Sequence, residues 1–491
     1  MNIEREKIRV RFAPSPTGFM HVGNARTAIF NDLFAKSNEG ELILRIEDTD
    51  VQRNKEGAEE QIINNLKWLG VKWTEGPDIG GKFGPYRQSE RTDLYEKAVR
   101  DLLDSEKAYR CFCSVDRLES LRKKAAEKKV PFHYDGKCRE VSKEESDKRA
   151  NSEQFVVRLK TDLNEPIIVK DLIKGDVRFE TETIDDFVVS RGYSLPIFHL
   201  AVVVDDAAMQ ITHVIRGEDH LSNTPKHILL QRALNLPTPF YAHLPLLLDE
   251  KKHKLSKRAG GVDLFVETLR KEEGYLSEAL ANGLALLGWN SKTDQEIFSY
   301  KELENIFNLN NIQKSGAVFS VERLKWINKQ HLKKLTAEQI YCTAKNFVES
   351  SQFGGFEEEK IFRVIEVEKE RISLLKEIPD ALSILIKPTL IKEKIGWKDT
   401  ANEDTLEILR YTENYLRKLN EQNWNSKENL HETFLKMADE SGKGRGPILW
   451  PLRYVLSGKD KSAGPDEIAW ILGKEETLER TSIGIKLLEN E

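Results

Sequence analysis

The sequence predicts an α/β fold: a parallel sheet with flanking helices, interrupted by an α+β insertion and followed by an all-α C-terminal part. Three observations predict it. The first fifty residues follow a strand–helix–strand pattern, short strands of mixed pattern fill the middle of the chain, and from about residue 262 the apolar residues recur at helical spacing.

Length and charge limit the function classes. The chain has 491 residues, enough for three or four domains of about 150 residues that each bury a core. Its 76 basic and 81 acidic residues nearly balance, which argues against a protein that covers nucleic acid nonspecifically. A local basic face is still compatible with this composition. The first ten residues lack the apolar core of a signal peptide, and no apolar run approaches the ~18 residues of a membrane span. We therefore expect a cytoplasmic protein without membrane contact.

The N-terminal segment predicts a βαβ unit. Apolar and basic residues alternate over 8–12, residues 24–40 carry helical apolar spacing up to a glycine, and residues 41–50 resume as a strand. Such units form parallel sheets, which bind ligands at the carboxyl ends of their strands. His21 follows such an end.

The middle of the chain predicts an insertion into the α/β domain. A second helix is expected over 56–70, and a glycine-rich loop follows at 76–91. The strongly apolar run 198–220 favours a return to the core of the sheet. Between them lie short strands of mixed pattern: 154–160, 166–180 and 186–191.

The C-terminal third has the pattern of an all-α region. Segments 357–378 and 404–421 carry apolar residues at helical spacing over the lengths of long amphipathic helices. The sequence has no repeat at a fixed period and no low-complexity tract. We therefore expect the chain to end in packed helices.

The stretch RFAPSPTGFMHVGN, residues 11–24, suits a phosphate-binding turn. A turn between a strand and a helix exposes backbone N–H groups that favour phosphate oxygens, and Gly18 and Gly23 let a nucleotide approach the main chain closely. His21 could then donate a hydrogen bond to a phosphate oxygen on which charge develops. For an isolated H-x-G motif, a histidine that only caps the helix is the better interpretation.

A second polar stretch, KKHKLSKRAGG, favours the nucleotide site. It places four donors in a short loop after the apolar strand 240–248, and the two glycines that follow allow the loop to move: Lys254, Ser256, Lys257 and Arg258. Donors on a mobile loop suit the triphosphate of ATP. A basic run alone is more often a solvated loop, but two phosphate-binding elements on one α/β sheet are much less expected by accident.

These stretches carry a resemblance. PSPTGFMHVGN and KLSKR resemble the HIGH and KMSKS signatures of class I aminoacyl-tRNA synthetases. RFAPSPTG, together with RIEDTD, GPYRQSER, VVDD, THVIRGEDH and NTP, is similar to bacterial glutamyl-tRNA synthetases, and PLRYVLSG and LGKEETLER extend the match toward the C-terminus. Asn24 stands where the HIGH signature has its second histidine, a substitution that the glutamyl group tolerates.

The resemblance implies a two-step reaction with glutamate, ATP with Mg²⁺, and tRNA(Glu). Glutamate and ATP would give glutamyl-adenylate and pyrophosphate, and a ribose hydroxyl of the terminal adenosine of the tRNA would then take the glutamyl group. The implied catalytic residues are His21, Lys254 and Lys257. The implied ATP-binding residues are Gly18, His21, Gly23, Asn24, Lys254, Ser256, Lys257 and Arg258.

For the amino acid, the resemblance points to Arg11, Ser15, Glu47, Phe198 and Arg216. Glu47 can pair with the substrate ammonium, and an arginine fork can hold a carboxylate through two parallel hydrogen bonds. The family usually has a tyrosine at the position of Phe198, so a hydroxyl that faces the substrate would be missing here.

Three cysteines close together in the sequence resemble the zinc site of some members of the family: Cys111, Cys113 and Cys138. Thiolates at i and i+2, with a third across a loop, can supply three tetrahedral zinc ligands. The fourth ligand would be Glu140, which stands where the family has a histidine, or Tyr134; His133 is a weaker candidate. Three reduced cysteines without metal are the other interpretation.

The resemblance also implies a division into domains. A Rossmann-type nucleotide-binding catalytic domain would comprise 1–86 and 198–261, and an inserted domain, 87–197, would hold the tRNA acceptor end and the zinc site. A helical domain, 262–340, would contact the tRNA stem, and 341–491 would bind the anticodon. We expect a monomer.

In the last of these domains, basic residues are candidates for contacts with tRNA: Lys443, Arg445 and Arg453. Trp450 and Tyr454 would be available to stack on bases. The all-α character itself favours the glutamyl group, since bacterial glutaminyl enzymes end in β-barrels.

Alternatives stay open beside the main interpretation. A non-discriminating enzyme would also charge tRNA(Gln), and a catalytically inactive paralogue would only bind tRNA. His21, Gly23, Lys254 and Lys257, all intact, argue against the second. Small nucleotidylyltransferases share an H-x-G-H turn, but they would not need the helical tail.

Overall fold

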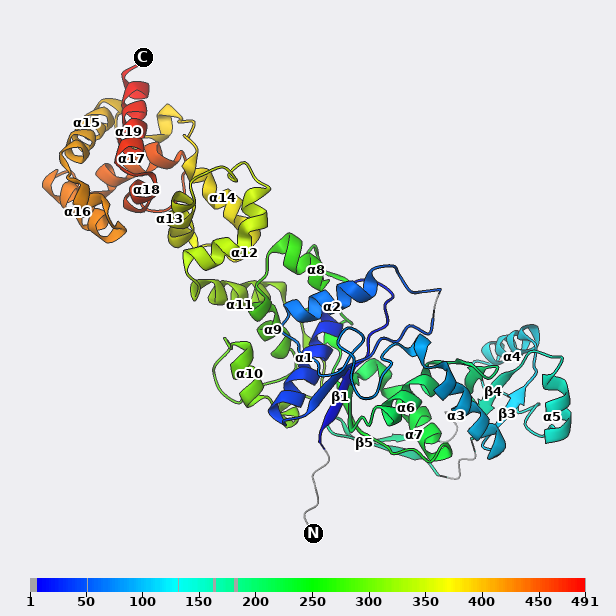
Figure 1. Cartoon of the computed structure of the whole chain (residues 1–491). Helices are drawn as coiled ribbons and strands as arrows, with labels where there is room; N and C mark the ends of the chain where they lie inside the picture. Colours follow the sequence, from blue (N-terminus) through cyan, green and yellow to red (C-terminus); the bar gives the residue numbers. More distant parts are fainter. Residues whose placement is uncertain (1–6, 51, 131, 162–164, 181–183, 491) are drawn as a thin grey trace, which may run out of the picture. The chain divides into compact units, whose positions relative to one another are not determined.

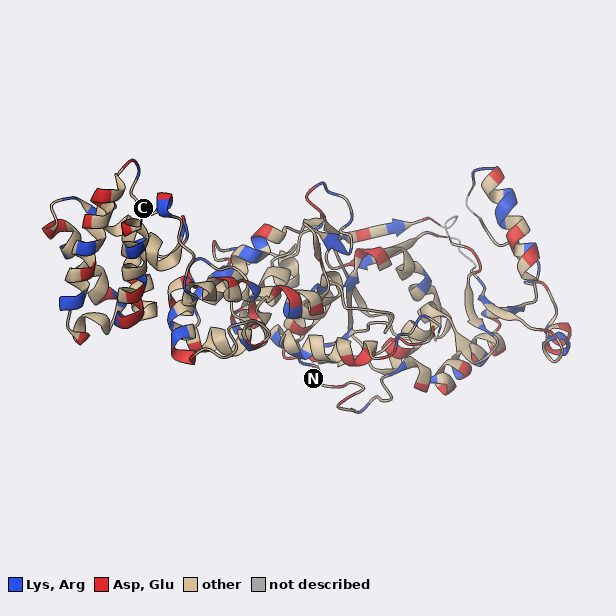
Figure 2. Cartoon of the chain, turned by 90° about the horizontal axis from the view of Figure 1, so that it is seen from above, with Lys and Arg blue, Asp and Glu red and all other residues tan. Residues whose placement is uncertain are grey.

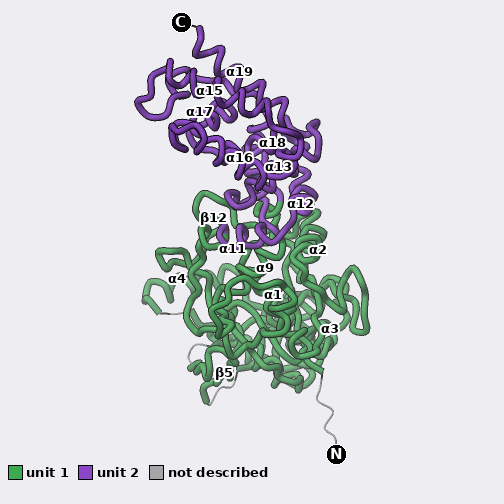
Figure 3. Tube along the Cα trace, turned by 90° about the vertical axis from the view of Figure 1, so that its left-hand side faces the viewer, with its two compact units in different colours: residues 1–270, 277–324 green, residues 271–276, 325–491 purple. Residues whose placement is uncertain are grey.

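The computed structural model describes residues 7–50, 52–130, 132–161, 165–180 and 184–490 (Figure 1). The chain divides into two compact units (Figure 3), residues 1–270 with 277–324, and residues 271–276 with 325–491. The first unit is mixed α/β and the second is helical in its described part, which confirms the predicted fold class. The domain boundaries expected from the resemblance remain predictions.

The predicted βαβ unit is present at the start of the chain. Strand β1 (Arg9–Phe12), helix α1 (Val22–Ser37) and strand β2 (Glu41–Leu44) follow one another, and β1 pairs with β2 in parallel. Every residue of β1 is buried, as expected for a strand covered on both faces. The chain leaves β1 through the turn that carries His21.

The larger parallel sheet combines strands from distant parts of the chain. Its order is β6-β5-β10-β9; β9, β10 and β5 run parallel, and β5 and β6 form an antiparallel hairpin. The strands are β5 (Ile167–Asp171), β6 (Gly175–Phe179), β9 (His213–Gly217) and β10 (Phe240–Leu244). The amide of Thr212 donates to the carbonyl of Arg9 at 2.9 Å, which joins the start of β9 to β1.

The apolar run 198–220, expected in the core of the sheet, begins with a helix. Phe198–Ala208 form α6, and only His213–Gly217 form a strand, so the prediction was wrong for the first half of the run. All residues from Leu200 to Asp206 are buried, and a helix without a polar face cannot be distinguished from a buried strand by its period. Helix α6 carries Asp205 and Asp206 into the core.

A second sheet in this unit is antiparallel, with the order β3-β4-β7-β8. Its strands are β3 (Ala108–Cys111), β4 (Val156–Leu159), β7 (Val188–Arg191) and β8 (Leu195–Pro196). Two short strand pairs complete the β-structure: β11 (Leu247–Leu248) with β14 (Ala317–Val318), and β12 (Arg258–Ala259) with β13 (Val262–Asp263). The other helices of this unit are α2 (Ala58–Trp68), α3 (Thr92–Asp104), α4 (Val115–Glu127), α5 (Lys143–Ala150), α7 (Thr224–Ala233), α8 (Val266–Thr268), α9 (Ser277–Ala285) and α10 (Tyr300–Ile306).

The second unit packs helices on helices. Segment 357–378, expected as one long helix, forms α13 only as far as Glu368, and a new helix begins at Ile378 with Pro379 in its first turn, where proline fits. No helix among the described residues is long and apolar enough to cross a membrane. The helices from the junction onward are α11 (Val321–Lys333), α12 (Ala337–Glu349), α13 (Glu358–Glu368), α14 (Ile378–Leu382), α15 (Asn402–Lys418), α16 (Lys427–Glu440), α17 (Arg445–Ser457), α18 (Pro465–Leu472) and α19 (Lys474–Glu489).

Candidate active site

A cavity of about 400 Å³ opens at the carboxyl ends of β1, β9 and β10. Its lining includes all residues predicted to contact glutamate: Arg11, Ser15, Glu47, Phe198 and Arg216. It also includes four of the predicted ATP residues: His21, Gly23, Asn24 and Lys254. A second cavity of about 380 Å³ shares part of this lining and adds Gly18 and Lys257. The structure therefore brings the two predicted sets of residues together.

His21 caps helix α1 and faces the loop of the second motif. Its Nδ1 accepts a hydrogen bond from the amide of Gly23 at 3.2 Å, so the proton of the neutral ring lies on Nε2, which is 3.2 Å from the carbonyl oxygen of Ser256. Burial, and less strongly the charge of Lys257, lowers the pKa of His21, which keeps the ring neutral at pH 7. His21 therefore caps α1 and also lines both cavities, and the cap fixes Nε2 as the donor.

The loop that carries the KLSKR motif is exposed. Lys254 and Lys257 line the cavities, whereas Arg258 lies outside both linings and forms an ion pair with Asp263. Ser256 contacts the site through its carbonyl oxygen. The motif thus offers Lys254 to a ligand in the first cavity and Lys257 to one in the second, fewer donors than the four that the sequence alone predicts.

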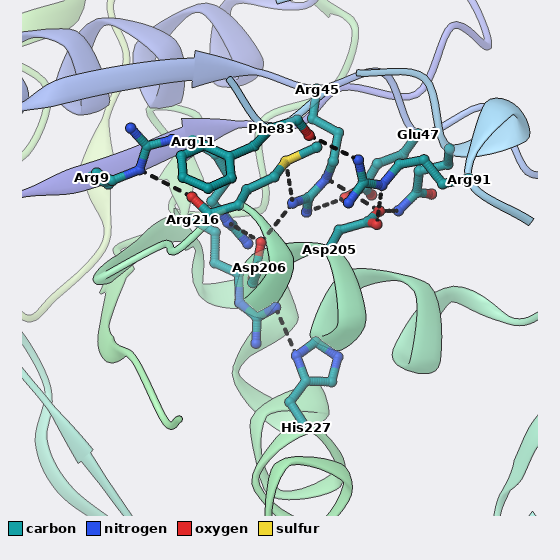
Figure 4. A network of polar contacts seen from close by, with 12 residues as sticks. Arg9, Arg11, Arg45, Glu47, Phe83, Arg91, Asp205, Asp206, Arg216 and His227 are labelled. Carbon is teal, nitrogen blue, oxygen red and sulfur yellow. Dashed lines mark hydrogen bonds and ion pairs between the residues drawn. The ribbon is translucent and has the colours of Figure 1, made fainter. Parts of the chain in front are cut away.

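A buried ionic network (Figure 4) includes Arg11 and Glu47 of the cavity lining. Asp206 on α6 accepts hydrogen bonds from Nε of Arg11 at 3.1 Å and from Nη1 of Arg45 at 2.7 Å. Arg45, which is fully buried, also donates from Nη2 to Glu47 at 3.0 Å. Asp206 and Arg45 thereby hold two cavity residues of opposite charge in place.

The network shifts the pKa values of its carboxyl groups in opposite directions. Burial raises the pKa of Glu47, and Arg45 and Arg11 offset this only in part. Burial acts in the same direction on Asp206, but Arg11 and Arg45 together outweigh it and lower the pKa of that group. Asp206 is therefore the firmly ionised partner of both arginines, and Glu47 gains most from a further cation such as an ammonium group.

Neutral groups surround the guanidinium of Arg216, which is 6% exposed. Its Nε donates to Nε2 of His243 at 3.2 Å, and its Nη1 faces Nδ1 of His227 at 3.4 Å. Its Nη2 donates to Oγ1 of Thr224 at 2.8 Å and to the carbonyl of His220 at 3.2 Å. All these partners accept hydrogen bonds without carrying a negative charge.

Arg216 has no carboxylate partner in the described part of the chain. Burial, with the nearby charge of Arg11, lowers the pKa of Arg216 to about 10, so the group still carries its charge at pH 7. A buried cation without an anionic partner is costly. Of the cavity residues, Arg216 therefore has the most to gain from an anionic ligand.

Phe198 forms an apolar part of the cavity wall. Its ring centroid lies 5.6 Å from that of His220 and 5.8 Å from that of His227. Since phenylalanine has no hydroxyl, this part of the wall offers no hydrogen bond to a ligand. Ser15 is exposed at the border that the two cavities share.

Three thiols gather at the edge of the second sheet: the sulfur atoms of Cys111, Cys113 and Cys138 lie within 4.8 Å of one another. Thiolates bound to a tetrahedral zinc at about 2.3 Å lie about 3.8 Å apart. Cys113 Sγ and Cys138 Sγ are 3.7 Å apart, which fits that metal. Tyr134 Oη lies 3.3 Å from Cys111 Sγ. The other two candidates for a fourth ligand are exposed: Glu140 and His133.

The basic residues predicted to contact tRNA lie in the second unit. Lys443 pairs with Glu407 at 3.1 Å, and Arg445 pairs with Asp439 at 3.4 Å. These are exposed ion pairs, which a phosphate could replace at little cost. Figure 2 shows basic and acidic residues interspersed along the helices rather than gathered in one large basic face.

The aromatic residues next to them differ in accessibility. The guanidinium of Arg453 lies 4.3 Å from the ring centroid of the half-buried Trp450, and the ring of Trp397 lies 5.4 Å from that of Trp450. Tyr454 is only 1% exposed, so the expectation that it is available for stacking was wrong: its ring belongs to the core.

Sequence reasoning missed the residues behind the cavity. Asp206 belongs to the VVDD motif and Thr224 to the NTP motif. Both motifs supported the family resemblance, but no residue in them was predicted to belong to the site. An aspartate in an otherwise apolar run is a signal that could have identified Asp206, because a buried carboxylate needs a buried partner. His243, alone in an apolar strand, gives no such signal.

Comparisons with known proteins found two family models that match the chain, together with similar sequences and structures. The family described as "tRNA synthetases class I (E and Q), catalytic domain" matches residues 7–326, and "Anticodon binding domain" matches residues 322–485. A "Glutamate--tRNA ligase" of Bacillus licheniformis is 38% identical over 96% of this chain and 98% of its own length. A "Glutamate--tRNA ligase" of Clostridium botulinum (strain Okra / Type B1) is 41% identical over 98% of this chain and 99% of its own length. The crystal structure of a glutamate tRNA ligase from Elizabethkingia meningosepticum in complex with its amino acid is similar with a TM-score of 0.89 and 35% identity, over 98% of this chain and 100% of that one.

Proposed function

This chain belongs to the glutamate--tRNA ligase family of class I tRNA synthetases, and from that premise we propose that it attaches L-glutamate to tRNA(Glu) at the expense of ATP. The observation that carries the proposal is the composition of the cavity lining. It combines two cations, Arg11 and Arg216, with one acidic residue, Glu47, and it also includes His21 and Lys254. Glutamate carries two carboxylates and one ammonium group, and this set of side chains matches those charges.

The reaction proceeds in two displacements. An oxygen of the glutamate α-carboxylate attacks the α-phosphorus of ATP, and pyrophosphate leaves. A ribose hydroxyl of the terminal adenosine of tRNA then attacks the carbonyl carbon of the adenylate, and AMP leaves. Mg²⁺ enters with ATP as part of that substrate. Neither step requires a covalent nucleophile of the enzyme, so the chain contributes positioning and stabilisation of charge.

The predicted charged residues of the cavity and His21 each have a role in this scheme. Glu47 pairs with the ammonium group, and Arg11 and Arg216 face the side-chain carboxylate. In the described part of the chain, Arg11 donates to protein only through Nε, so its terminal nitrogens remain for the ligand. His21 donates from Nε2 to a phosphate oxygen, and the loop lysines neutralise the charge of the departing pyrophosphate.

We also propose one zinc ion, held by Cys111, Cys113 and Cys138. The sulfur spacing supports this assignment, and the short distance from Tyr134 Oη to Cys111 supports Tyr134 as fourth ligand in place of the exposed Glu140. When bound, the ion supplies a structural cross-link and takes no part in the reaction.

The tRNA contacts follow the same premise. Residues 87–197 hold the acceptor end, 262–340 contact the stem, and 341–491 bind the anticodon, where Lys443, Arg445 and Arg453 are available for phosphates or bases. The cytoplasmic location and monomeric state stay predictions.

Pyrophosphate exchange tests the function. The purified full-length chain should exchange pyrophosphate into ATP with glutamate and tRNA(Glu) present, and should charge tRNA(Glu). Charging of tRNA(Gln) to the same extent in a parallel reaction would identify a non-discriminating enzyme. Binding of tRNA(Glu) without any exchange would identify the inactive paralogue.

A further inference from the structure

A line of buried polar contacts behind Arg216 has no role in the function proposed above. His243 on β10 is the register partner of Arg216 on β9. Its Nε2 lies 3.2 Å from Nε of Arg216, and its Nδ1 lies 2.6 Å from Oδ2 of Asp171 on β5. The side chains of His243 and Asp171 are fully buried. The contacts thus connect the cavity with the β5–β6 hairpin.

The neighbours of His243 determine where its proton lies. Nε of Arg216 can only donate, so Nε2 of His243 must be the acceptor, and the carboxylate of Asp171 can only accept, so Nδ1 must carry the proton. Burial lowers the pKa of His243, and Asp171 offsets this only in part, so the ring is neutral. A single tautomer, protonated on Nδ1, satisfies Arg216 and Asp171, and it leaves Nε2 able to accept also from Oγ1 of Thr224 at 3.1 Å.

Asp171 is itself fixed by the backbone of the hairpin. Its Oδ1 accepts hydrogen bonds from the amides of Ile173 at 2.9 Å and Lys174 at 2.7 Å, and its Oδ2 also accepts from the amide of His243 at 3.1 Å. The carboxylate therefore cannot turn away from the imidazole without breaking the turn. The hairpin thereby orients the ring of His243.

The hydrogen bonds of Arg216 leave few N–H groups for a ligand, so the orientation of the guanidinium determines whether it can bind one. Among the described residues, Nε donates once, Nη1 once and Nη2 twice to protein groups, which leaves one of the five N–H groups, on Nη1, for a ligand. A rotation of the guanidinium would therefore carry this single donor away from the cavity.

We propose that His243 is a positioning residue for Arg216, and that Asp171 fixes the tautomer which this task requires. The hairpin from the middle of the chain would then set the direction in which Arg216 meets the side-chain carboxylate of the substrate. This inference rests on the proposed function, because that function supplies the carboxylate.

Two substitutions at position 243 separate the contact with Arg216 from the contact with Asp171. The amide of Asn reaches the place of Nδ1 and can still donate to Asp171, but it offers nothing to Arg216. The amide of Gln reaches the place of Nε2 and can still accept from Arg216. We expect His243→Asn to raise the KM for glutamate roughly ten- to a hundredfold, with the KM for ATP changed less than about threefold. His243→Gln should keep the KM for glutamate within about fivefold of wild type.

Pyrophosphate exchange by the full-length variants, with glutamate and tRNA(Glu) present, measures both constants. His213→Asn is the matched control, since His213 lies on the same sheet but stacks on Phe240, with ring centroids 5.0 Å apart. A wild-type KM for glutamate in His243→Asn, or equal losses in the Asn and Gln variants, would overturn the inference.

If His243→Asn does not fold, nitrogen-15 NMR of the wild-type imidazoles tests the inference instead, because it reports which ring nitrogen of His243 carries the proton. We expect a neutral His243 protonated on Nδ1, and a neutral ring protonated on Nε2 overturns the inference. Wild-type chain that shows no exchange would contradict the proposed function instead, whereas the tautomer measurement does not depend on that function.

Discussion

The Nε2 atom of His21 lies 3.2 Å from the carbonyl oxygen of Ser256, although 235 residues separate the two in the sequence. Because Nδ1 accepts from the amide of Gly23, this contact uses the single N–H of the neutral ring. The carbonyl therefore occupies the donor that we propose for a phosphate oxygen of ATP. Binding of ATP is expected to displace it and to move the exposed loop that carries Lys257.

Replacement of Lys257 by Ala should lower the rate of adenylate formation at least about a hundredfold, because a positioned cation at a developing charge is worth several kcal/mol. The affinity for tRNA should stay nearly unchanged. Pyrophosphate exchange and a tRNA-binding assay measure the two quantities, and Lys251→Ala, an exposed lysine outside both cavity linings, is the control. Near-wild-type exchange in a folded Lys257→Ala variant would remove this residue from the mechanism.

Discrimination between glutamate and glutamine should depend on Arg216. The two amino acids hardly differ in shape, but the amide of glutamine would turn an NH₂ group toward arginine donors, and sites of this kind reject the wrong ligand by factors on the order of ten thousand. We expect the wild type to activate glutamate and not glutamine. Arg216→Gln should lower kcat/KM for glutamate far more than it changes the KM for ATP, as exchange kinetics will show. An unchanged kcat/KM would mean that Arg216 does not bind the carboxylate.

Asp206→Asn should destabilise the fold, because it leaves Arg11 and Arg45 buried without their shared anion. Breaking a buried ion pair costs about 3 to 5 kcal/mol of the free energy of unfolding, which urea titration measures. The exposed Asp101→Asn variant is the control and should unfold like the wild type.

The same variant should change the response to acid. The pKa of Asp206 is lowered in the folded chain, so its carboxylate contributes its full stabilisation above the unfolded value of about 3.9 and loses it as pH falls through the folded value. Below about pH 4, the free energy of unfolding should fall less steeply for Asp206→Asn than for the wild type. Parallel slopes for the two proteins would contradict the ionised state of Asp206.

Zinc should copurify at about one ion per chain, as elemental analysis of protein prepared without chelator will show. Cys113→Ser should lower that content, whereas Cys342→Ser, an exposed cysteine elsewhere in the chain, should not. Glu140→Gln should leave the content unchanged if Tyr134 is the fourth ligand. Wild-type protein without zinc, whose three clustered thiols titrate freely in the folded state, would support the metal-free interpretation.

Local sequence patterns were sufficient to predict the elements that carry the candidate site. The alternation in residues 8–12 and the helical spacing that follows predict the βαβ unit, and the confirmed family resemblance draws on motifs that lie in its turn and in the loop around Lys257. Such motifs are readable because a strand end, a tight turn and a set of donors each need particular residue types at fixed spacing.

The buried residues behind the cavity could not be predicted from local sequence patterns. Helix α6 has no polar face, so its period did not distinguish it from a strand. The contact of Asp171 with His243 depends on the pairing of β5 with β10, and nothing local to either strand predicts that pairing. Tyr454 was misjudged because burial of a side chain is decided by the packing of whole helices.

The hydrogen bond between Arg9 of β1 and Thr212, the residue before β9, has a consequence for synthesis of the chain. Arg9 emerges early from the ribosome, but its hydrogen-bonding partner Thr212 follows some two hundred residues later. At about 5 to 20 residues per second, roughly 10 to 40 s pass before β1 can meet this neighbour. Over that interval β1 can pair with β2, but Arg9 lacks Thr212 and Arg11 lacks Asp206. The first half of the chain is therefore expected to reach its final packing only after residues beyond 212 have emerged.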